Sequence, residues 1–356
     1  MTEILRWGIL GTGIIAQQFA RGLRALPDAR LVAVGSRTAE TAERFGRTFD
    51  VPHRHASYAA LAEDPEVDVV YVATPHPFHA ENTLLCLRAG KAVLCEKPFT
   101  LNAAEARTVI AEARARRLFL MEAMWMRYLP AMVQVRRWLA EGVIGEVRMV
   151  TADFGFRAAF DPHSRLFDPA LGGGALLDVG IYPISLAFMV LGTPTRVTGV
   201  AQLGETGVDE HSAYLFEYPQ GQLAVLSSAV RTTTPTEAWI LGTEGAIHIH
   251  PLMYRPERVT VRRHLPEVSS RLPASLKALG RALGLERPWQ QARTRGGKAY
   301  HFPLKGNGYN YEADEVARCM AAGKLESAVM PLDETLTIME TLDQLRAPWG
   351  LVYPGE

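Results

Sequence analysis

Apolar and polar positions alternate in blocks over the first third of the chain. Residues 5–10 and 67–73 are almost continuously apolar, as is typical of strands buried on both faces of a sheet. Asn102 can cap a later helix, with Glu105 reaching back from the third helical position. The predicted strands cover residues 5–10, 30–35, 67–73, 92–95 and 119–122, and the predicted helices cover 14–25, 38–49, 79–89 and 102–117. This alternation predicts a doubly wound α/β domain with a parallel sheet over residues 1–123.

The pattern changes after Ala123, where strand-like segments follow one another through short turns such as Pro219-Gln220-Gly221. We expect a C-terminal α+β domain, residues 124–356, with helices on one face of a mostly antiparallel open sheet. A helix-free face would suit pairing with another copy, so a homodimer or higher homo-oligomer is expected. The predicted strands cover 147–156, 196–202, 212–218, 222–230, 238–241 and 246–249, and the predicted helices cover 130–141, 175–191, 311–322 and 333–345.

The segment 266–298 is basic and rich in arginine. Its pattern is that of a helical insertion followed by a loop. Two interpretations stay open for this segment, namely a solvated face of the molecule or a flap over an active site.

Charge and cysteine content narrow the class of protein. The 38 Lys and Arg residues balance 38 Asp and Glu residues, which argues against nucleic acid or an anionic membrane surface as a partner. No apolar run suggests a membrane span, and residues 1–10 have the pattern of a strand rather than a signal peptide. The cysteines, Cys86, Cys95 and Cys319, are scattered, so neither a disulfide framework nor a metal site is expected, and a reducing cytoplasm is the expected compartment.

A glycine-rich turn follows the first predicted strand and opens the first predicted helix. Its sequence is Gly11-Thr12-Gly13-Ile14-Ile15-Ala16, a G-x-G-x-x-A motif. Gly11 permits a tight turn, Gly13 allows a pyrophosphate to approach the backbone, and Ala16 keeps the helix close to the sheet. The phosphates would bind the free N–H groups at the helix N-terminus. The motif at this position predicts a Rossmann-type dinucleotide-binding domain.

The end of the second predicted strand indicates which dinucleotide is bound. NAD enzymes usually place an acidic residue there to hold the ribose 2′-hydroxyl. This chain has Gly35-Ser36-Arg37-Thr38 instead. Ser36 can donate to a 2′-phosphate, and Arg37 can pair with it. NADP is therefore the expected cofactor, and NAD is the alternative if Arg37 is only an exposed loop residue.

Candidate chemistry lies at the carboxyl ends of the other parallel strands, which line the ligand crevice of such a sheet. Lys97, in the run Cys95-Glu96-Lys97-Pro98, is placed to reach both a nicotinamide ring and a substrate oxygen. Pro98 restricts Lys97 to an extended backbone. Thr74 and His79 follow another of these strands, and we expect them on the cofactor side of the crevice.

These motifs, together with the run from Gly172 to Tyr182 (GGGALLDVGIY), resemble the Gfo/Idh/MocA oxidoreductase family. The runs LCEKP at 94–98 and LMEAMW at 120–125 are similar to its dihydrodiol dehydrogenase and NADP-dependent D-xylose dehydrogenase branch. The resemblance implies that Lys97 is catalytic, that Glu96 and Lys97 contact nicotinamide, and that Asp178 lies in the substrate site. It also implies that Trp125 and Phe154 wall the substrate cleft. Many members carry His and Asp where this chain has Tyr182 and Ser185.

The resemblance implies that Tyr182 would supply an acid or base in place of that histidine. A hydroxyl that loses hydride must also lose its proton, so a base is needed beside the reacting carbon. Free tyrosine has a pKa of about 10, and we expect the Lys97 ammonium to lower it. Asp178, four residues earlier, would share a helix face with Tyr182 and orient it or the substrate. Arg127 is expected to meet the cofactor or a substrate hydroxyl.

The sequence thus predicts an NADP-dependent enzyme that transfers hydride at a hydroxyl-bearing carbon of a sugar or trans-diol. One alternative is a redox-neutral, glycosidase-like enzyme that retains NAD, and Arg37 counts against it. The other is a non-catalytic sensor of NADP or sugar on the same fold. The presence of Lys97, Asp178 and Tyr182 counts against the sensor.

Overall fold

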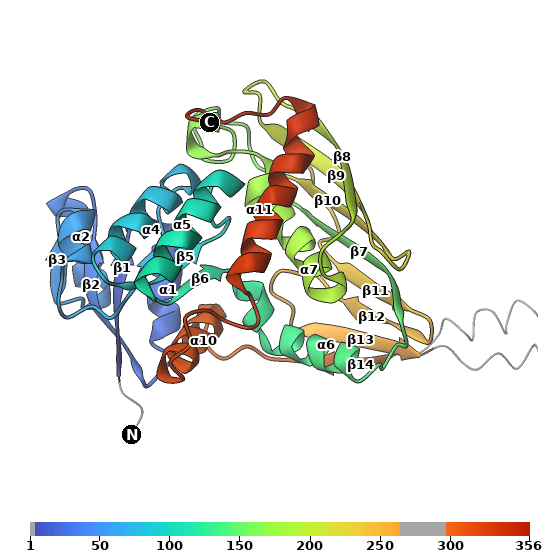
Figure 1. Cartoon of the computed structure of the whole chain (residues 1–356), viewed down its shortest axis with the longest axis horizontal. Helices are drawn as coiled ribbons and strands as arrows, with labels where there is room; N and C mark the ends of the chain where they lie inside the picture. Colours follow the sequence, from blue (N-terminus) through green and yellow to red (C-terminus); the bar gives the residue numbers. More distant parts are fainter. Residues whose placement is uncertain (1–3, 264–296) are drawn as a thin grey trace, which may run out of the picture.

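The computed structural model describes residues 4–263 and 297–356. The described chain contains two β-sheets with helices packed on them. Helix α11 (Leu332–Arg346) lies between the two sheets. It contacts α5 (Ala103–Arg116) on one side and α7 (Ile181–Leu191) on the other (Figure 1). The basic segment expected at 266–298 lies outside the described residues, apart from its last two positions. The α/β class expected from the sequence is confirmed.

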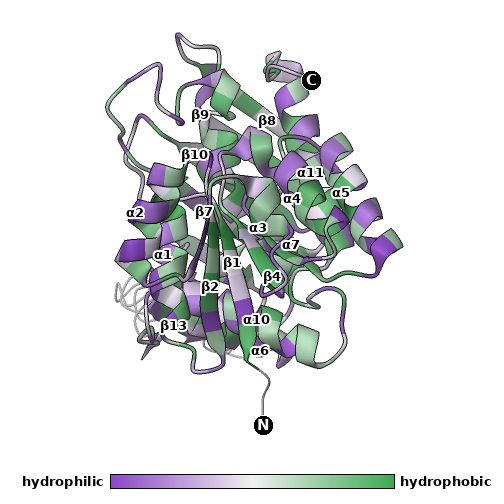
Figure 2. Ribbon diagram, turned by 90° about the vertical axis from the view of Figure 1, so that its left-hand side faces the viewer, coloured by the Kyte–Doolittle hydropathy of each residue, from purple (hydrophilic) through white to green (hydrophobic). Residues whose placement is uncertain are grey.

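The first sheet is wholly parallel and has the strand order β3-β2-β1-β4-β5-β6. Hydrophilic residues gather on the outward turns of α2 and α5, whereas strands β2 and β4 carry mostly hydrophobic ones (Figure 2). The strands are β1 (Leu5–Leu10), β2 (Ala29–Gly35), β3 (His53–His55), β4 (Val69–Val72), β5 (Ala92–Glu96) and β6 (Leu120–Ala123). The helices are α1 (Ile14–Leu23), α2 (Ala39–Phe49), α3 (Tyr58–Ala62), α4 (His79–Arg88) and α5, with the short 3-10 helix η1 (His76–Phe78) before α4.

The predicted cap of α5 is present. The side chain of Asn102 accepts a hydrogen bond from the Glu105 N–H at 2.9 Å, and the Glu105 carboxylate accepts one from the Leu101 N–H at 3.0 Å. The sequence analysis did not expect β3 or α3, because both are short and neither has a long apolar run.

The second sheet has eight strands in the order β14-β13-β12-β11-β7-β10-β9-β8. All of its pairs are antiparallel except β7 with β10, so the mostly antiparallel sheet is confirmed. The strands are β7 (Val147–Gly155), β8 (Arg196–Leu203), β9 (Asp209–Glu217), β10 (Leu223–Ala229), β11 (Ala238–Gly242), β12 (Gly245–Ile249), β13 (Arg258–Arg263) and β14 (Lys298–His301). Its helices include η2 (Trp125–Tyr128), α6 (Pro130–Ala140), η3 (Pro169–Leu171), α7 and α10 (Tyr309–Ala321).

The segment 169–191 corrects one expectation from the sequence. It has a mean hydropathy of 1.8 over its most apolar window, so its length and composition suffice to cross a membrane. In the fold, 83% of that window is buried. The segment therefore packs as a core helix beneath the second sheet. Its C-terminal part consists of the π-helical turn η4 (Leu176–Gly180) and then α7.

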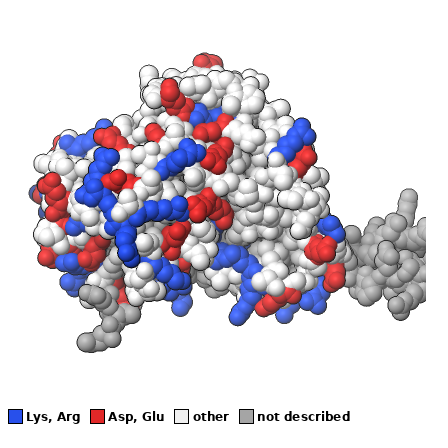
Figure 3. Space-filling view, in the orientation of Figure 1, with Lys and Arg blue, Asp and Glu red and all other residues white. Residues whose placement is uncertain are grey.

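Charged side chains of both signs are interspersed over the face seen in Figure 3. Many of them form pairs along single helices, for example Arg116 with Glu112 at 2.6 Å. This distribution agrees with the equal numbers of acidic and basic residues in the sequence.

Candidate active site

The glycine turn between β1 and α1 has an open surface suited to phosphate groups. Gly11 adopts a φ of +107°, and a Cβ atom there would lie 2.7 Å from the Ala73 carbonyl oxygen, so this position requires glycine. A Cβ atom on Gly13 would meet no described atom within 4 Å. Gly13 is the N-cap of α1 and makes no side-chain cap, which leaves the first helical N–H groups for an anion.

One cavity of about 580 Å³ extends from this turn to the end of β5. Its adenosine-side wall carries hydroxyl groups and a guanidinium group, and the lining residues of that wall include no carboxylate. That wall is formed by Ser36, Arg37, Thr38, Thr41 and Tyr58, next to Thr12, Ile14 and Ile15 of the turn. Such a wall fits a phosphorylated ribose better than a free 2′-hydroxyl.

Lys97 and Asp178 form a buried ion pair at the opposite end of the cavity. The Lys97 Nζ donates to the Asp178 carbonyl oxygen at 2.7 Å and to Asp178 Oδ1 at 3.2 Å. Arg165 donates to the same Oδ1 at 2.9 Å. Burial opposes the charge on Asp178, but Lys97 and Arg165 outweigh it and hold the pKa of the carboxyl well below its usual range. Burial also opposes the charge on Lys97, and Asp178 outweighs it, so the pKa of the ammonium is raised.

Tyr182 lies beside this pair. The Lys97 Nζ is 5.1 Å from the centroid of the Tyr182 ring, and the Tyr182 hydroxyl accepts a hydrogen bond from Trp125 Nε1 at 3.0 Å. Burial raises the pKa of the Tyr182 phenol to about 12, and Lys97 offsets that effect only in part. The sequence-based expectation of a lowered pKa is therefore wrong, because sequence spacing did not reveal how deeply the ring is buried.

Aromatic rings surround Tyr182. Trp125 stacks on Tyr309 with centroids 4.6 Å apart, and Phe154 stacks on Tyr254 at 4.4 Å. Phe154 also lies 5.5 Å from the Tyr182 ring. The structure thus brings Trp125, Phe154, Tyr182 and Tyr309 together, and it adds Tyr254, which the sequence analysis did not assign to this site.

Thr74, His76 and His79 line the middle of the cavity. The two ring nitrogens of His79 lie 2.8 Å from the Pro98 and Thr74 carbonyl oxygens. Burial lowers the pKa of His79, so its neutral ring donates to one of these carbonyls at a time. His79 therefore braces the walls of the cavity, and its polar atoms are turned toward the protein rather than toward a ligand.

Glu96 precedes Lys97 and accepts hydrogen bonds from the Tyr71 hydroxyl and from the Lys97 N–H. Burial raises the pKa of the Glu96 carboxyl. Glu312, on α10, is also fully buried, and its two carboxyl oxygens have no hydrogen-bond partner among the described residues. Burial and the nearby Glu96 raise the pKa of Glu312 well above its usual value, so we expect a neutral carboxyl there.

Arg127 does not lie where the sequence analysis expected it. Its guanidinium is buried and donates to the Ser185 hydroxyl at 2.8 Å and to the Ser185 carbonyl at 2.7 Å. It also pairs with Glu334 at 2.6 Å. Arg127 therefore joins η2 to α7 and α11, and it does not line the cavity. Conversely, Arg165 lies in the loop between β7 and η3, where no sequence periodicity pointed to a role.

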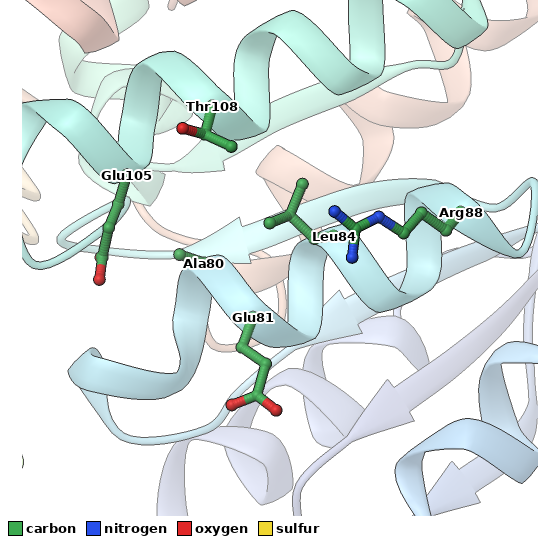
Figure 4. Close-up of a pocket in the computed structure, with 6 residues that line it drawn as sticks. All are labelled: Ala80, Glu81, Leu84, Arg88, Glu105 and Thr108. Atoms are coloured by element: carbon green, nitrogen blue, oxygen red, sulfur yellow. The ribbon is translucent and has the colours of Figure 1, made fainter.

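A second cavity, of about 320 Å³, lies between α4 and α5. Figure 4 shows Leu84 and Arg88 on α4 facing Thr108 and Glu105 on α5. It shares no lining residue with the larger cavity, and the glycine turn and Lys97 do not border it. We therefore place the candidate active site in the larger cavity.

Two family models match the chain. Residues 5–124 match the model described as an oxidoreductase family with an NAD-binding Rossmann fold, and residues 132–248 match the GFO/IDH/MocA C-terminal domain. The chain is similar to trans-1,2-dihydrobenzene-1,2-diol dehydrogenase of Mus musculus, with 38% identity over 356 residues and 99% of each chain covered. The enzyme of that name from Homo sapiens is 35% identical over 366 residues, again with 99% of each chain covered.

Solved structures agree with this fold over nearly the whole chain. A 3-ketoreductase from Actinomadura kijaniata, in complex with NADP and TDP-benzene, has a TM-score of 0.79 at 27% identity and covers 96% of this chain and 97% of its own. An aldose-aldose oxidoreductase from Caulobacter crescentus has a TM-score of 0.81 at 24% identity, with 97% of each chain covered. With the resemblance noted in the sequence confirmed over its full length, the chain belongs to the Gfo/Idh/MocA oxidoreductase family.

Proposed function

We propose that this protein is an NADP-dependent oxidoreductase that exchanges a hydride with a hydroxyl-bearing carbon of a small sugar or trans-diol. The observation that carries the proposal is the single cavity joining the glycine turn to Lys97 and Asp178. The relatives support the reaction type, since they are named as a dihydrobenzene-diol dehydrogenase and a 3-ketoreductase.

The residues of the cavity fit NADP at both ends. Gly13 leaves space where a Cβ atom would obstruct a pyrophosphate, and the start of α1 offers N–H groups to it. Ser36 and Arg37 would bind the 2′-phosphate. Thr74, Glu96 and Lys97 would border the nicotinamide, which supplies or accepts the hydride when bound.

Lys97 and Tyr182 are the groups that would move or stabilise charge at the substrate. Tyr182 is a neutral phenol at neutral pH, because its pKa is raised to about 12, so it is ready to donate a proton. Lys97 has three N–H donors, and two of them are directed to Asp178. The third would donate to a substrate carbonyl and stabilise the negative charge that develops on its oxygen during reduction. In the oxidising direction Tyr182 must first lose its own proton to solvent, which the Lys97 ammonium favours, and the resulting phenolate then accepts the proton of the substrate hydroxyl.

Asp178 would position Lys97 rather than take part in proton transfer. Its carboxyl stays ionised between Lys97 and Arg165, since both cations favour its charged form. The aromatic rings of Trp125 and Phe154 would face the apolar side of a sugar or diol ring. Such a site holds the substrate by one polar edge and one apolar face, which suits a polyhydroxylated ring.

We also propose that residues 1–123 bind the cofactor, that residues 124–356 bind the substrate and mediate assembly, and that the protein works in the cytoplasm. The three cysteines are free and buried, as suits a reducing compartment.

The exposed face of the second sheet supports a homodimer. Val200 on β8, Leu215 on β9 and Val225 on β10 are 70%, 40% and 43% exposed. Leu215 is directly opposite Val225, and the neighbouring positions of both strands point to the helix-covered side. An apolar patch on one face of an open sheet favours pairing with a second copy.

The first test is the appearance or loss of NADPH absorbance in the near ultraviolet, with a panel of aldoses, ketoses and trans-dihydrodiols. We expect turnover with NADP and at least one member of the panel. Tight NADP binding without any turnover would instead favour a sensor. Cleavage of a glycoside with no net change in NADPH would favour the redox-neutral alternative.

Two substitutions test the catalytic groups. Lys97→Met and Tyr182→Phe should each lower kcat by about 100- to 10,000-fold, the usual contribution of a positioned acid or base. NADP binding, measured by fluorescence titration, should persist, because Asp178 keeps Arg165 as a partner when Lys97 is removed. Lys305→Met changes an exposed lysine outside the cavity and serves as the control. A near-normal kcat in Lys97→Met would contradict its assigned role.

Arg37→Asp tests cofactor choice. Loss of a charge-assisted hydrogen bond, worth about 1.5–3 kcal/mol, should lower the ratio of kcat/KM for NADP over NAD by about 10- to 100-fold. The control Arg47→Asp makes the same charge change on α2, at an exposed position that does not line the cavity. An unchanged ratio in Arg37→Asp would show that Arg37 does not recognise the phosphate.

The double variant Val200→Glu/Val225→Glu tests the assembly. Buried like charges would oppose pairing of the sheets, so light scattering after size exclusion should show the mass of a single chain instead of twice that mass. Val133→Glu, at an exposed valine on α6, should leave the dimer intact. A monomeric wild type, or a double variant that stays dimeric, would refute the proposed interface.

A further inference from the structure

Two histidines and an aspartate meet at the outer edge of the parallel sheet, away from the ion pair of the active site. His53 and His55 are alternate residues of the edge strand β3, so their side chains lie on the same face of that strand. Asp64, just after α3, faces them from the neighbouring segment. One potential ligand atom from each residue lies within 4.8 Å of the other two.

The hydrogen bonds of Asp64 fix the orientation of this group. Its Oδ2 atom lies 2.6 Å from His53 Nδ1 and 2.8 Å from His55 Nε2. Its Oδ1 atom accepts a hydrogen bond from the Glu66 N–H at 2.8 Å. Asp64 is buried, whereas the His53 and His55 side chains are 39% and 24% exposed. Three side chains therefore converge on one point, and the point is open to solvent from the histidine side.

This donor set suits a particular class of ion. Two imidazole nitrogens and one carboxylate oxygen are ligands for Zn²⁺ and similar transition metals, whereas Mg²⁺ and Ca²⁺ prefer oxygen ligands alone. Tetrahedral bonds of about 2.0–2.1 Å place neighbouring ligand atoms about 3.3 Å apart. The two contacts to Asp64, now 2.6 Å and 2.8 Å, would lengthen by about 0.7 Å and 0.5 Å to reach that spacing, which the partly exposed histidines can accommodate.

The two positively charged side chains next to the cluster donate their hydrogen bonds to groups other than the Asp64 carboxylate. Arg54, between the two histidines in sequence, points to the other face and donates to the Val51 carbonyl and to Glu43. The Lys91 ammonium approaches the main chain of Asp64, donating to the Asp64 and Val67 carbonyl oxygens. Neither cation donates to the Asp64 carboxylate in the described chain.

We propose that His53, His55 and Asp64 bind one divalent transition-metal ion of the zinc class, with water in the remaining position. The ion would replace the two histidine protons that now point at Asp64, and it would join the edge strand β3 to the end of α3. The sequence analysis expected no metal site because the cysteines are scattered along the chain. The third ligand here is nine residues beyond the second and is brought near only by the fold.

The location gives the ion a structural role near the cofactor cavity. The His55 carbonyl oxygen accepts a hydrogen bond from the Ser36 N–H at 3.1 Å, and Ser36 lines the adenosine side of that cavity. Bound metal would therefore restrain the strand that supports the Arg37 turn. It would not take part in hydride transfer, because Lys97, with the Tyr182 ring beside it, lies at the opposite end of the cavity.

The test is calorimetric titration of the full-length, chelator-treated protein with zinc chloride, repeated with cobalt chloride and visible absorption. Wild type should bind one ion per chain, and cobalt should give the absorption bands of a site with nitrogen and oxygen ligands. His55→Gln and Asp64→Asn keep hydrogen-bonding groups but remove ligands, and each should weaken zinc binding by about 100-fold or more, beyond the cost of an outer-shell change.

His250→Gln is the matched control, since His248 and His250 form another His-x-His pair, on and just after β12. Glu237 contacts His248 at 2.8 Å, but among the described residues these three do not form a group whose ligand atoms all lie within 4.8 Å of one another. It should bind zinc as wild type does. Circular dichroism and NADP binding check that each variant is folded. The proposal is overturned if wild type binds no zinc, if His55→Gln and Asp64→Asn bind it unchanged, or if His250→Gln abolishes the binding.

Discussion

The ion pair between Lys97 and Asp178 joins the two halves of the structure, and the geometry of the candidate site depends on it. Lys97 follows a strand of the parallel sheet, whereas Asp178 lies in the helical layer of the second sheet. Removing both charges from water is costly, so such a pair persists only where further hydrogen bonds satisfy it. Arg165 and the main-chain carbonyl of Asp178 supply them here. A second bridge, from His76 to the Gly172 carbonyl at 3.0 Å, holds the same boundary.

Local sequence patterns explain why much of the first sheet and of the cofactor turn could be predicted. A parallel strand covered on both faces is apolar along its whole length, so residues 5–10 and 67–73 were recognisable, and the catalytic lysine candidate followed from its position after such a strand. The glycine turn was equally local, because Gly11 is required by a backbone conformation and by a close approach to Ala73. The edge strand β3, with the sequence His-Arg-His, carries no such pattern.

The parts that could not be predicted depend on where a side chain points or on how deeply it is buried. Arg127 is close to Trp125 in the chain, yet its guanidinium donates a hydrogen bond to Ser185. Arg165 carried no signal in the sequence, yet its guanidinium donates to Asp178 in the candidate site. The raised pKa of Tyr182 likewise reflects the aromatic rings packed around it. Sequence identifies the titratable group, but the balance of desolvation against neighbouring charge exists only in the assembled structure.

The π-helical turn at Leu176–Gly180 has a consequence for how sites of this kind diversify. A π-helical turn corresponds to an α-helix that has gained one residue, and each residue of an α-helix turns the chain by about 100°. Deleting a single residue there would rotate the preceding segment relative to α7 and direct a different side chain at the lysine. In such a scaffold, a change of one residue in length can replace the acidic partner of the lysine without any substitution. Insertions and deletions in a helix can therefore change which reaction the site supports.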